Sequence, residues 1–266
     1  MNEVQASRRV SVCVDDFGLS RASCLAAIEL AARGLVSAVS SVVDGEHIGS
    51  FASELQSSQQ TCTLGLHLNL TERSAFRYTS SLRMWVARAA VARLWHRRLI
   101  AEINRQLDRF EHLYGCPPAF VDGHEHVHQL CVVREPLLEV LGWRYGSQIA
   151  LRSTVPLERR GFKAGIIARL GGYALRDAAR QRHIAANRDF AGVYDFSTRI
   201  PYEQHMRAWL ASIADGGLIM CHPELPDDES CASRARLAEF EFFLSPRWRA
   251  LYEEFNFQLT PFAAHS

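Results

Sequence analysis

Short apolar runs alternate with amphipathic stretches along most of the chain. The first run, Val10–Val14, is continuous and rich in β-branched residues, which is typical of a strand buried on both faces of a sheet. Ser20 follows it and can cap a helix that extends to about Arg33, where Gly34 can end the helix. The chain therefore opens with a predicted strand followed by a predicted helix.

The same unit recurs to the end of the sequence. Further strands are predicted at Ala38–Val43, Thr63–Leu70, Ala119–Val121, Gln148–Leu151, Leu218–Cys221 and Asn256–Leu259, and Phe190–Phe196 is predicted to be strand or loop. Helices are predicted at His47–Leu55, Leu82–Tyr114, Val133–Leu141, Tyr202–Ile213 and Ala232–Phe243, with broken helix between Gly161 and Arg188. This alternation argues for a parallel sheet, and seven or eight strands favour a barrel over an open doubly wound sheet. We predict an α/β fold, a single irregular TIM-like β/α barrel of about seven or eight mostly parallel strands, in one domain over residues 1–266.

Composition narrows the class of protein. Hydrophobic residues make up 48% of the 266 residues, which is enough for a sizeable core, and the net charge of +1 gives no reason to expect a nucleic-acid partner. No apolar stretch is long enough to span a bilayer, and the N-terminus lacks an apolar signal core. The seven cysteines are odd in number and form no C-x-x-C pair, which favours free thiols in a reducing cytoplasm.

Polar residues gather at the ends of four predicted strands. They are Asp15 and Asp16, then His67 and Asn69, then Asp122, His124, His126 and His128 in VDGHEHVH, and finally His222 and Glu224 in MCHPE. Each group alone has a structural interpretation, such as a turn cap, a buried core histidine or a solvated loop. In a parallel barrel, however, all four strand ends lie on one face, where active sites form. Together they favour a metal-dependent active site.

The residue types suit hydrolysis. Imidazole and carboxylate ligands bind hard or borderline divalent ions, and two histidines with one carboxylate leave positions open for water and substrate. A second carboxylate beside such a set could accept a proton from the attacking water, and a histidine across the site could protonate the leaving group.

Four motifs carry a resemblance to a known family. VDDFGLS, GLHLNLT, DGHEHVH and MCHPE, spread from Val14 to Glu224, resemble those of the YdjC-like carbohydrate deacetylases. That family includes chitooligosaccharide deacetylase and a deacetylase associated with hopanoid biosynthesis. The resemblance implies an irregular β/α barrel, often a homodimer, that removes an acetyl group from an N-acetylated sugar. It also implies a divalent metal ion, usually magnesium, with zinc as the alternative.

The resemblance also implies roles for individual residues. The metal ligands would be Asp16, His67 and His124. By analogy with NodB-type deacetylases, Asp15 would be the catalytic base and His222 the catalytic acid, although the two aspartates could exchange roles. Substrate-binding or supporting roles would fall to a second group: Asn69, Asp122, His126 and His128.

Other functions stay open at this point. The substrate could be an oligosaccharide or a lipid-linked glycan, the scissile bond could be a different carbon–nitrogen bond, and the chain could be a non-catalytic sugar-binding protein. The Arg- and Trp-rich stretch Leu82–Arg98 fits an amphipathic helix packed on the barrel with solvated arginines. Its alternative interpretation is an interfacial surface for peripheral membrane contact.

Overall fold

A computed structural model describes residues 6–58, 61–72, 81, 83–85, 92–228 and 232–263. Its strands are β1 (Arg8–Phe17), β2 (Ala38–Ser41), β3 (Thr63–Leu68), β4 (Phe120–Gly123), β5 (Ala150–Leu151), β6 (Ala185–Ala186), β7 (Asp189–Ala191), β8 (Gly217–Cys221) and β9 (Phe257–Leu259). Its α-helices are α1 (Arg21–Ala32), α2 (Ile48–Gln56), α4 (Ala92–Tyr114), α5 (Cys131–Tyr145), α6 (Phe162–Ile167), α7 (Tyr173–Gln181), α8 (Tyr202–Ser212), α9 (Arg234–Leu244) and α10 (Pro246–Glu254). Short 3₁₀ segments η2 (His124–Gln129) and η3 (Gly146–Gln148) and a π-helical segment η4 (Ala168–Gly172) complete the order.

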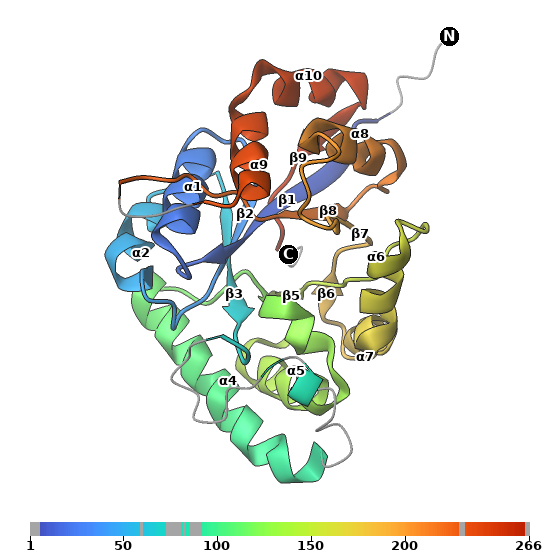
Figure 1. Ribbon diagram of the computed structural model, residues 1–266. Helices are drawn as coiled ribbons and strands as arrows, with labels where there is room; N and C mark the ends of the chain where they lie inside the picture. The colour runs from blue at the N-terminus through green and yellow to red at the C-terminus, as the bar shows by residue number, and fades with distance from the viewer. Residues whose placement is uncertain are drawn as a thin grey trace.

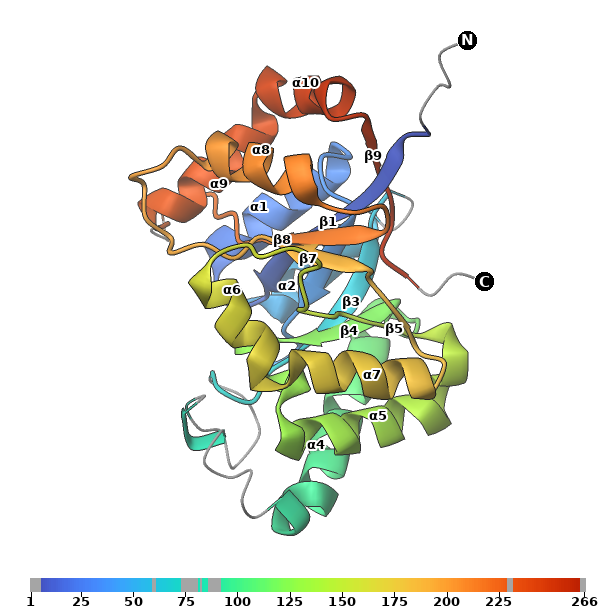
Figure 2. The same ribbon diagram turned by 90° about the vertical axis from the view of Figure 1, so that its right-hand side faces the viewer.

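The nine described strands form one sheet in the order β6-β5-β4-β3-β2-β1-β8-β7, with β9 beside β1. All of the strand pairs are parallel. The sheet curls, with α8, α9 and α10 above it and α4, α5 and α7 below it (Figures 1 and 2). Among the described residues no strand pair joins β6 to β7, so the barrel is irregular at that position. The predicted TIM-like barrel of mostly parallel strands is confirmed.

Strand β1 lies inside this sheet and pairs with three other strands. It pairs with β9 from Arg8 to Val10, with β8 from Val10 to Val14 and with β2 from Cys13 to Phe17. Eight of its ten residues are buried, as the apolar run predicted. The polar carboxyl end of β1 is therefore held rigidly in the middle of the molecule.

Aromatic side chains fill the interior of the barrel. Phe120 and Phe190 belong to an inner cluster in which β1 and β2 contribute only the small residues Cys13 and Ala38. Gly65 makes room for this filling, because a Cβ atom there would lie 2.3 Å from the ring of Phe120. The leucines of β3 belong to the outer cluster that packs on the helices, because alternate side chains of a strand point to the same face.

The first helix follows its sequence signals. The Ser20 hydroxyl accepts a hydrogen bond from the backbone N–H of Ser23 at 3.0 Å, and the Ser23 side chain accepts one from the N–H of Ser20. This reciprocal cap begins α1, and Gly34 follows its end at φ 63°. The helix orients the turn that follows the two aspartates.

Three features differ from the predicted elements. The two-residue strand β6 and the helix α10 were not predicted. The predicted helix Leu82–Tyr114 appears as helical residues 83–85 and as α4, while Leu82 and residues 86–91 lie outside the described residues. Within the Arg- and Trp-rich stretch, Trp85 is buried and donates a hydrogen bond to the Leu70 carbonyl at 3.0 Å. No helix of the described part of the chain is both long and apolar enough to cross a bilayer.

Candidate active site

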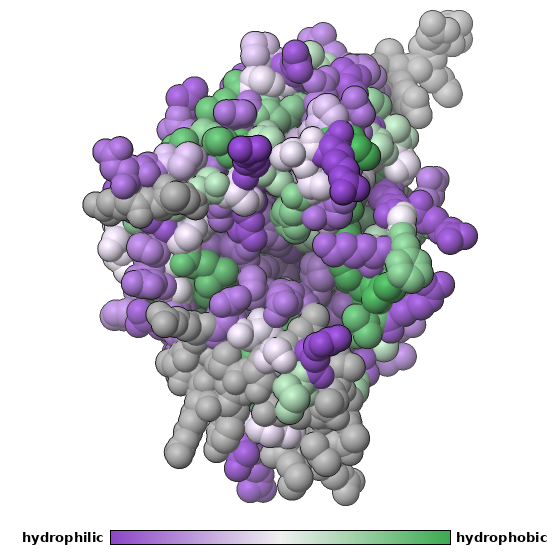
Figure 3. All heavy atoms as spheres, in the orientation of Figure 1, coloured by the Kyte–Doolittle hydropathy of each residue, from purple (hydrophilic) through white to green (hydrophobic). Residues whose placement is uncertain are grey.

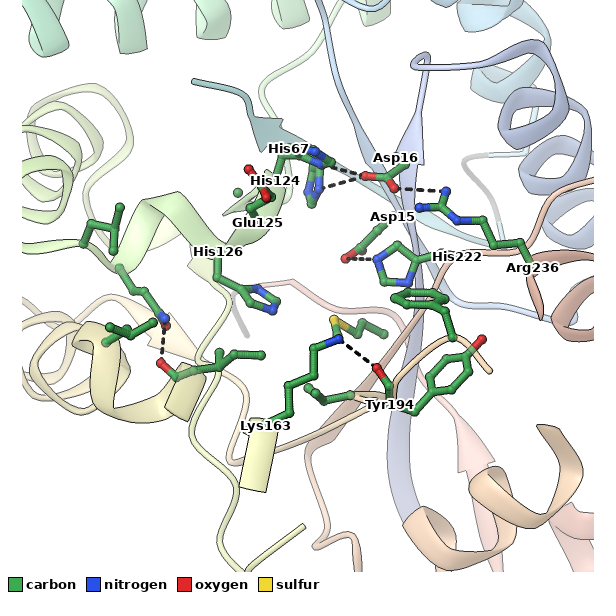
Figure 4. Close-up of a pocket in the computed structure, with 18 residues that line it drawn as sticks. Asp15, Asp16, His67, His124, Glu125, His126, Lys163, Tyr194, His222 and Arg236 are labelled. Carbon is green, nitrogen blue, oxygen red and sulfur yellow. Dashed lines mark hydrogen bonds and ion pairs between the residues drawn. The ribbon is translucent and has the colours of Figure 1, made fainter. Parts of the chain in front are cut away.

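The polar strand ends meet in one pocket of about 340 Å³. Polar side chains form part of its lining: Asp15, Asp16, His67, His124, His222 and Arg236. Apolar side chains also line it, among them Ile167, Leu170, Val193 and Phe196. Figure 3 shows the opening as a hydrophilic hollow at the centre of the molecule, and Figure 4 shows its side chains.

A local irregularity of β1 turns two consecutive aspartates into this pocket. Neighbouring residues of a regular strand point to opposite faces of the sheet. Here the register between β1 and β2 shifts between Val14 and Phe17, and Asp16 adopts a left-handed φ of 66°. Such strain in a residue other than glycine is typical of functional sites. Asp15 and Asp16 consequently line the same cavity.

Asp16, His67 and His124 form a compact set of possible metal ligands. The Asp16 Oδ1 atom lies 2.9 Å from His124 Nδ1 and 3.4 Å from His67 Nε2. All three residues offer a ligand atom within 4.8 Å of the others. Asp122 Oδ1 accepts a hydrogen bond from His67 Nδ1 at 2.7 Å, which leaves Nε2 facing Asp16. Two imidazoles, one carboxylate and a supporting carboxylate fit a divalent ion.

A buried arginine, Arg152, contacts both Asp15 and Asp122. Arg152 follows β5, has no exposed surface, and donates to both oxygens of Asp15 at 2.6 Å. Its Nη2 atom also lies 2.5 Å from Asp122 Oδ2. Arg152 thus links Asp15 to the carboxylate that supports His67. The sequence analysis missed it, although a charged residue directly after the strand Gln148–Leu151 was a usable signal.

These contacts set the protonation states in the metal-free protein. Burial alone would raise the pKa of Asp15, but the charge and hydrogen bonds of Arg152 hold this pKa well below its usual value. Burial is likewise outweighed at Asp16, where hydrogen bonds from His124 and His67 keep the pKa well below its usual range. Against the effect of burial, Asp122 raises the pKa of His67 to about 10. Both pocket aspartates are therefore ionised at neutral pH.

His222 directly follows β8, and its side chain lies beside Asp15. Its Nε2 atom lies 3.8 Å from Asp15 Oδ2, and its ring packs against Phe196 with the ring centres 5.2 Å apart. Burial lowers the pKa of His222, which favours the neutral imidazole in the free protein. The backbone N–H of His222 donates to Glu239 Oε2 at 2.6 Å.

Glu239 and Arg236 both come from α9, and the sequence analysis missed both. Glu239 is fully buried, also accepts a hydrogen bond from the Tyr194 hydroxyl, and has a pKa that burial raises to about 7. Arg236 lies 3.3 Å from Asp16 Oδ2 and 3.1 Å from Glu224 Oε1. Glu224, singled out in the sequence, therefore reaches the site only through Arg236.

Of the remaining predicted residues His126, His128 and Asn69, His126 lines the pocket and the other two do not. His126 lines the pocket at a left-handed φ of 60°, and burial holds its pKa well below the usual value. His128 lies behind the pocket, where Nε2 donates to the Arg152 carbonyl at 3.0 Å. Asn69 accepts hydrogen bonds from the backbone of the turn that follows β3 and is not among the pocket residues.

The sequence model described as "YdjC-like protein" matches residues 9–254. The chain belongs to the YdjC-like family. This YdjC-like chain is 28% identical over 263 residues to the chitooligosaccharide deacetylase of Serratia marcescens, with 94% of the chain and 96% of the relative covered. It is 26% identical to the chitooligosaccharide deacetylase of Yersinia enterocolitica, with 93% and 95% covered.

A solved structure shares the fold of this YdjC-like chain. It belongs to a protein of Enterococcus faecalis V583 that is described provisionally as a cellobiose-phosphate cleavage protein. The TM-score is 0.70 at 20% sequence identity, with 96% of this chain and 98% of that chain covered. At this identity the likeness establishes a common fold.

Proposed function

We propose that this chain is a metal-dependent hydrolase that removes the acetyl group from an N-acetylated sugar. The observation that carries the proposal is one pocket in which a two-histidine, one-carboxylate set adjoins a second ionised carboxylate and a further histidine. The names of the relatives, which act on chitooligosaccharides, support the same chemistry.

In this proposal Asp16, His67 and His124 hold the divalent ion, with magnesium favoured by the resemblance and zinc as the alternative. When bound, such an ion supplies Lewis-acid polarisation of the amide carbonyl. Asp122 supports the set by orienting His67 through the Nδ1 hydrogen bond. Asp15 is proposed to lie outside the ligand set, because each of its oxygens already accepts a hydrogen bond from Arg152.

Asp15 and His222 are the proposed proton-transfer pair. Asp15 is ionised at neutral pH and accepts the proton of the attacking water. Because Arg152 keeps the pKa of Asp15 low, the carboxyl gives this proton up readily, and His222 Nε2 lies 3.8 Å away to receive it. His222 then protonates the amine nitrogen, which is a poor leaving group without a proton.

The apolar side chains of the pocket contribute by limiting access of water. Among them, Phe196 packs against the ring of His222, and Val193 and Met220 also line the cavity. Exclusion of water strengthens the electrostatic interactions of ionised groups with the reacting atoms. His126, on the rim of the same cavity, is proposed to contact the sugar.

The deciding experiment measures acetate release from defined N-acetylated sugars with and without chelator. Hydrolysis should stop in chelator and return on addition of magnesium, zinc or a similar ion. Full activity in a metal-free preparation would contradict the proposal. Hydrolysis of other amides alone would favour the alternative carbon–nitrogen hydrolase, and metal binding without turnover would favour a sugar-binding protein.

Variants of the two aspartates test the assignment within the pair. Asp16→Asn should weaken metal binding, and Asp15→Asn should leave it intact. The opposite result would exchange their roles. A single domain over residues 1–266, a cytoplasmic location and a homodimer stay predictions.

A further inference from the structure

One buried carboxyl group lies next to the pocket without lining it. Glu239 belongs to α9, has no exposed surface, and has apolar neighbours such as Phe240 and Phe243 that belong to the outer hydrophobic cluster. Burial raises the pKa of Glu239 to about 7, so a carboxyl group at this position is less favourable than an apolar side chain unless its hydrogen bonds are needed. The residue therefore points to a role that depends on those bonds.

Glu239 accepts hydrogen bonds from two separate segments of the chain. Its Oε2 atom accepts from the backbone N–H of His222 at 2.6 Å, at the residue that directly follows β8. Its Oε1 atom accepts from the hydroxyl of Tyr194, which lies between β7 and α8. One buried side chain thus connects the strand end that carries the proposed acid to the loop that follows β7.

That loop carries the ring against which His222 packs. Phe196, two residues after Tyr194, meets the His222 imidazole edge-on, and the ring centres are 5.2 Å apart. Phe196 adopts a left-handed φ of 56°, which is strained for a residue other than glycine. Such strain persists only where surrounding contacts hold the backbone, and the bond from Tyr194 to Glu239 is one of these contacts. Figure 4 shows Tyr194 and His222 on the same side of the pocket.

The His222 ring depends on this support because hydrogen bonds of its own do not fix it. Within the described part of the chain, Nδ1 is buried without a hydrogen-bond partner, and Nε2 lies 3.8 Å from Asp15 Oδ2. The direction of the ring is therefore set by its backbone and by packing. A displacement of about 1 Å at a reacting group can lower a rate by roughly a hundredfold.

We propose that Glu239 is a positioning residue, which holds the backbone of His222 and the Phe196 loop in the arrangement that proton transfer to the leaving amine requires. This inference rests on the proposed function, because Glu239 acts through the proposed acid. Glu239 itself exchanges no proton in this role. An amide offers the same two bonds, since its oxygen can accept from the His222 N–H and its NH₂ group can donate to the Tyr194 hydroxyl oxygen.

The kinetic test compares Glu239→Gln with Glu239→Met in the metal-loaded protein, on an N-acetylated sugar that the native protein hydrolyses. Glu239→Gln keeps both bonds, so its kcat should stay close to the native value. Glu239→Met fills a similar volume but leaves the His222 N–H and the Tyr194 hydroxyl without an acceptor. It should lower kcat by about tenfold or more with little change in KM. Tyr194→Phe removes only the bond to the loop and should cause a smaller loss of kcat.

Asp189→Asn is the matched control for loss of a buried carboxylate. Asp189 has no exposed surface, accepts a hydrogen bond from the backbone N–H of Leu157 at 2.8 Å, and does not line the pocket. The variant should lower stability in thermal unfolding and leave kcat of the folded protein unchanged. This comparison separates positioning of His222 from a general effect on stability.

Hydrogen exchange of the His222 N–H, followed by NMR, gives a readout that needs no turnover. Exchange should be faster in Glu239→Met than in the native protein, and Glu239→Gln should keep the protection. If the native protein hydrolyses no N-acetylated sugar while this protection depends on residue 239, the proposed function fails and the contact of Glu239 with His222 holds.

Three results overturn the positioning role. They are a native kcat in Glu239→Met, a loss of kcat in Glu239→Gln as large as that in Glu239→Met, and equal exchange in all three proteins. If Glu239→Met does not fold, Tyr194→Phe decides, and a native kcat in that variant overturns the role as well.

Discussion

Replacement of Arg152 by methionine should destabilise the metal-free protein strongly. The guanidinium contacts two carboxylates at 2.5–2.6 Å, and Arg152, Asp15 and Asp122 are each at most 2% exposed. Removing one partner of a buried ion pair costs about 3–5 kcal/mol, because the remaining charge is left buried and unpaired. For a chain of this size that corresponds to a Tm lower by roughly 6–20 °C.

The pH dependence gives the prediction a second signature. In the native protein the lowered pKa of Asp15 contributes stability above its unfolded pKa of about 4, and this stability is lost as the pH falls through the folded pKa. In Arg152→Met, burial without a cation raises the pKa of Asp15. Protonation then relieves the buried charge, so the difference in Tm from the native protein should shrink between pH 7 and pH 5.

The assay is thermal unfolding in chelator, with two companion variants. Arg152→Lys keeps the charge without the forked geometry and should recover part of the loss. Arg9→Met removes the exposed pair with Asp215, whose side chains are 50% and 40% exposed, and should change Tm little. If Arg152→Met unfolds no more easily than Arg9→Met at pH 7, the buried network does not stabilise the site as argued.

Four further outcomes are expected. His67→Ala should lose metal affinity in a metal titration together with turnover, whereas His96→Ala, on the exposed face of α4, should lose neither. Asp15→Asn should keep metal binding in the same titration and lose turnover by about a hundredfold or more, and equal turnover would refute its role as base. His222→Ala should slow hydrolysis to a similar extent and flatten the acid limb of the pH–rate profile, because the native imidazole must be neutral to receive the proton from Asp15. Burial raises the pKa of Glu239 to about 7, so the contribution of its protonated form to stability is lost as the pH rises from about 4 through 7. Glu239→Gln should therefore gain stability relative to the native protein between pH 5 and pH 8. Chemical unfolding at both pH values measures this difference.

Local patterns in the sequence were sufficient for the strand ends that carry the proposed ligands. The apolar run before Asp15 identified a buried strand, and the run Thr63–Leu70 identified the strand that carries His67. The same local patterns missed β6, which has two residues, and α10, which follows its neighbour α9 after a single residue. A strand of two residues is too short for a period to be visible.

The supporting residues could not be predicted because their roles depend on distant partners. Arg152 is buried only because it meets Asp15, 137 positions earlier in the chain. Glu239 occupies an ordinary helical position, and its burial follows from contact with the end of β8. Conversely, Asn69 was predicted as a site residue, yet its side-chain oxygen accepts hydrogen bonds from the backbone of the turn that follows it. Local periodicity contains no information about such pairings.

The position of β1 inside the sheet has a consequence for synthesis of the chain. Of the described strands, β1 is made first, but its partners β8 and β9 lie more than 200 residues later. Asp16, His67 and His124 can come together once β1, β3 and β4 exist, whereas His222 arrives only with β8. Pairing across such separations is slow, and one edge of β1 lacks its hydrogen-bonding partner in the meantime. The nascent chain therefore completes its proposed metal set early and its proton-transfer pair last, and a chain cut short before β8 would present an apolar, aggregation-prone strand edge.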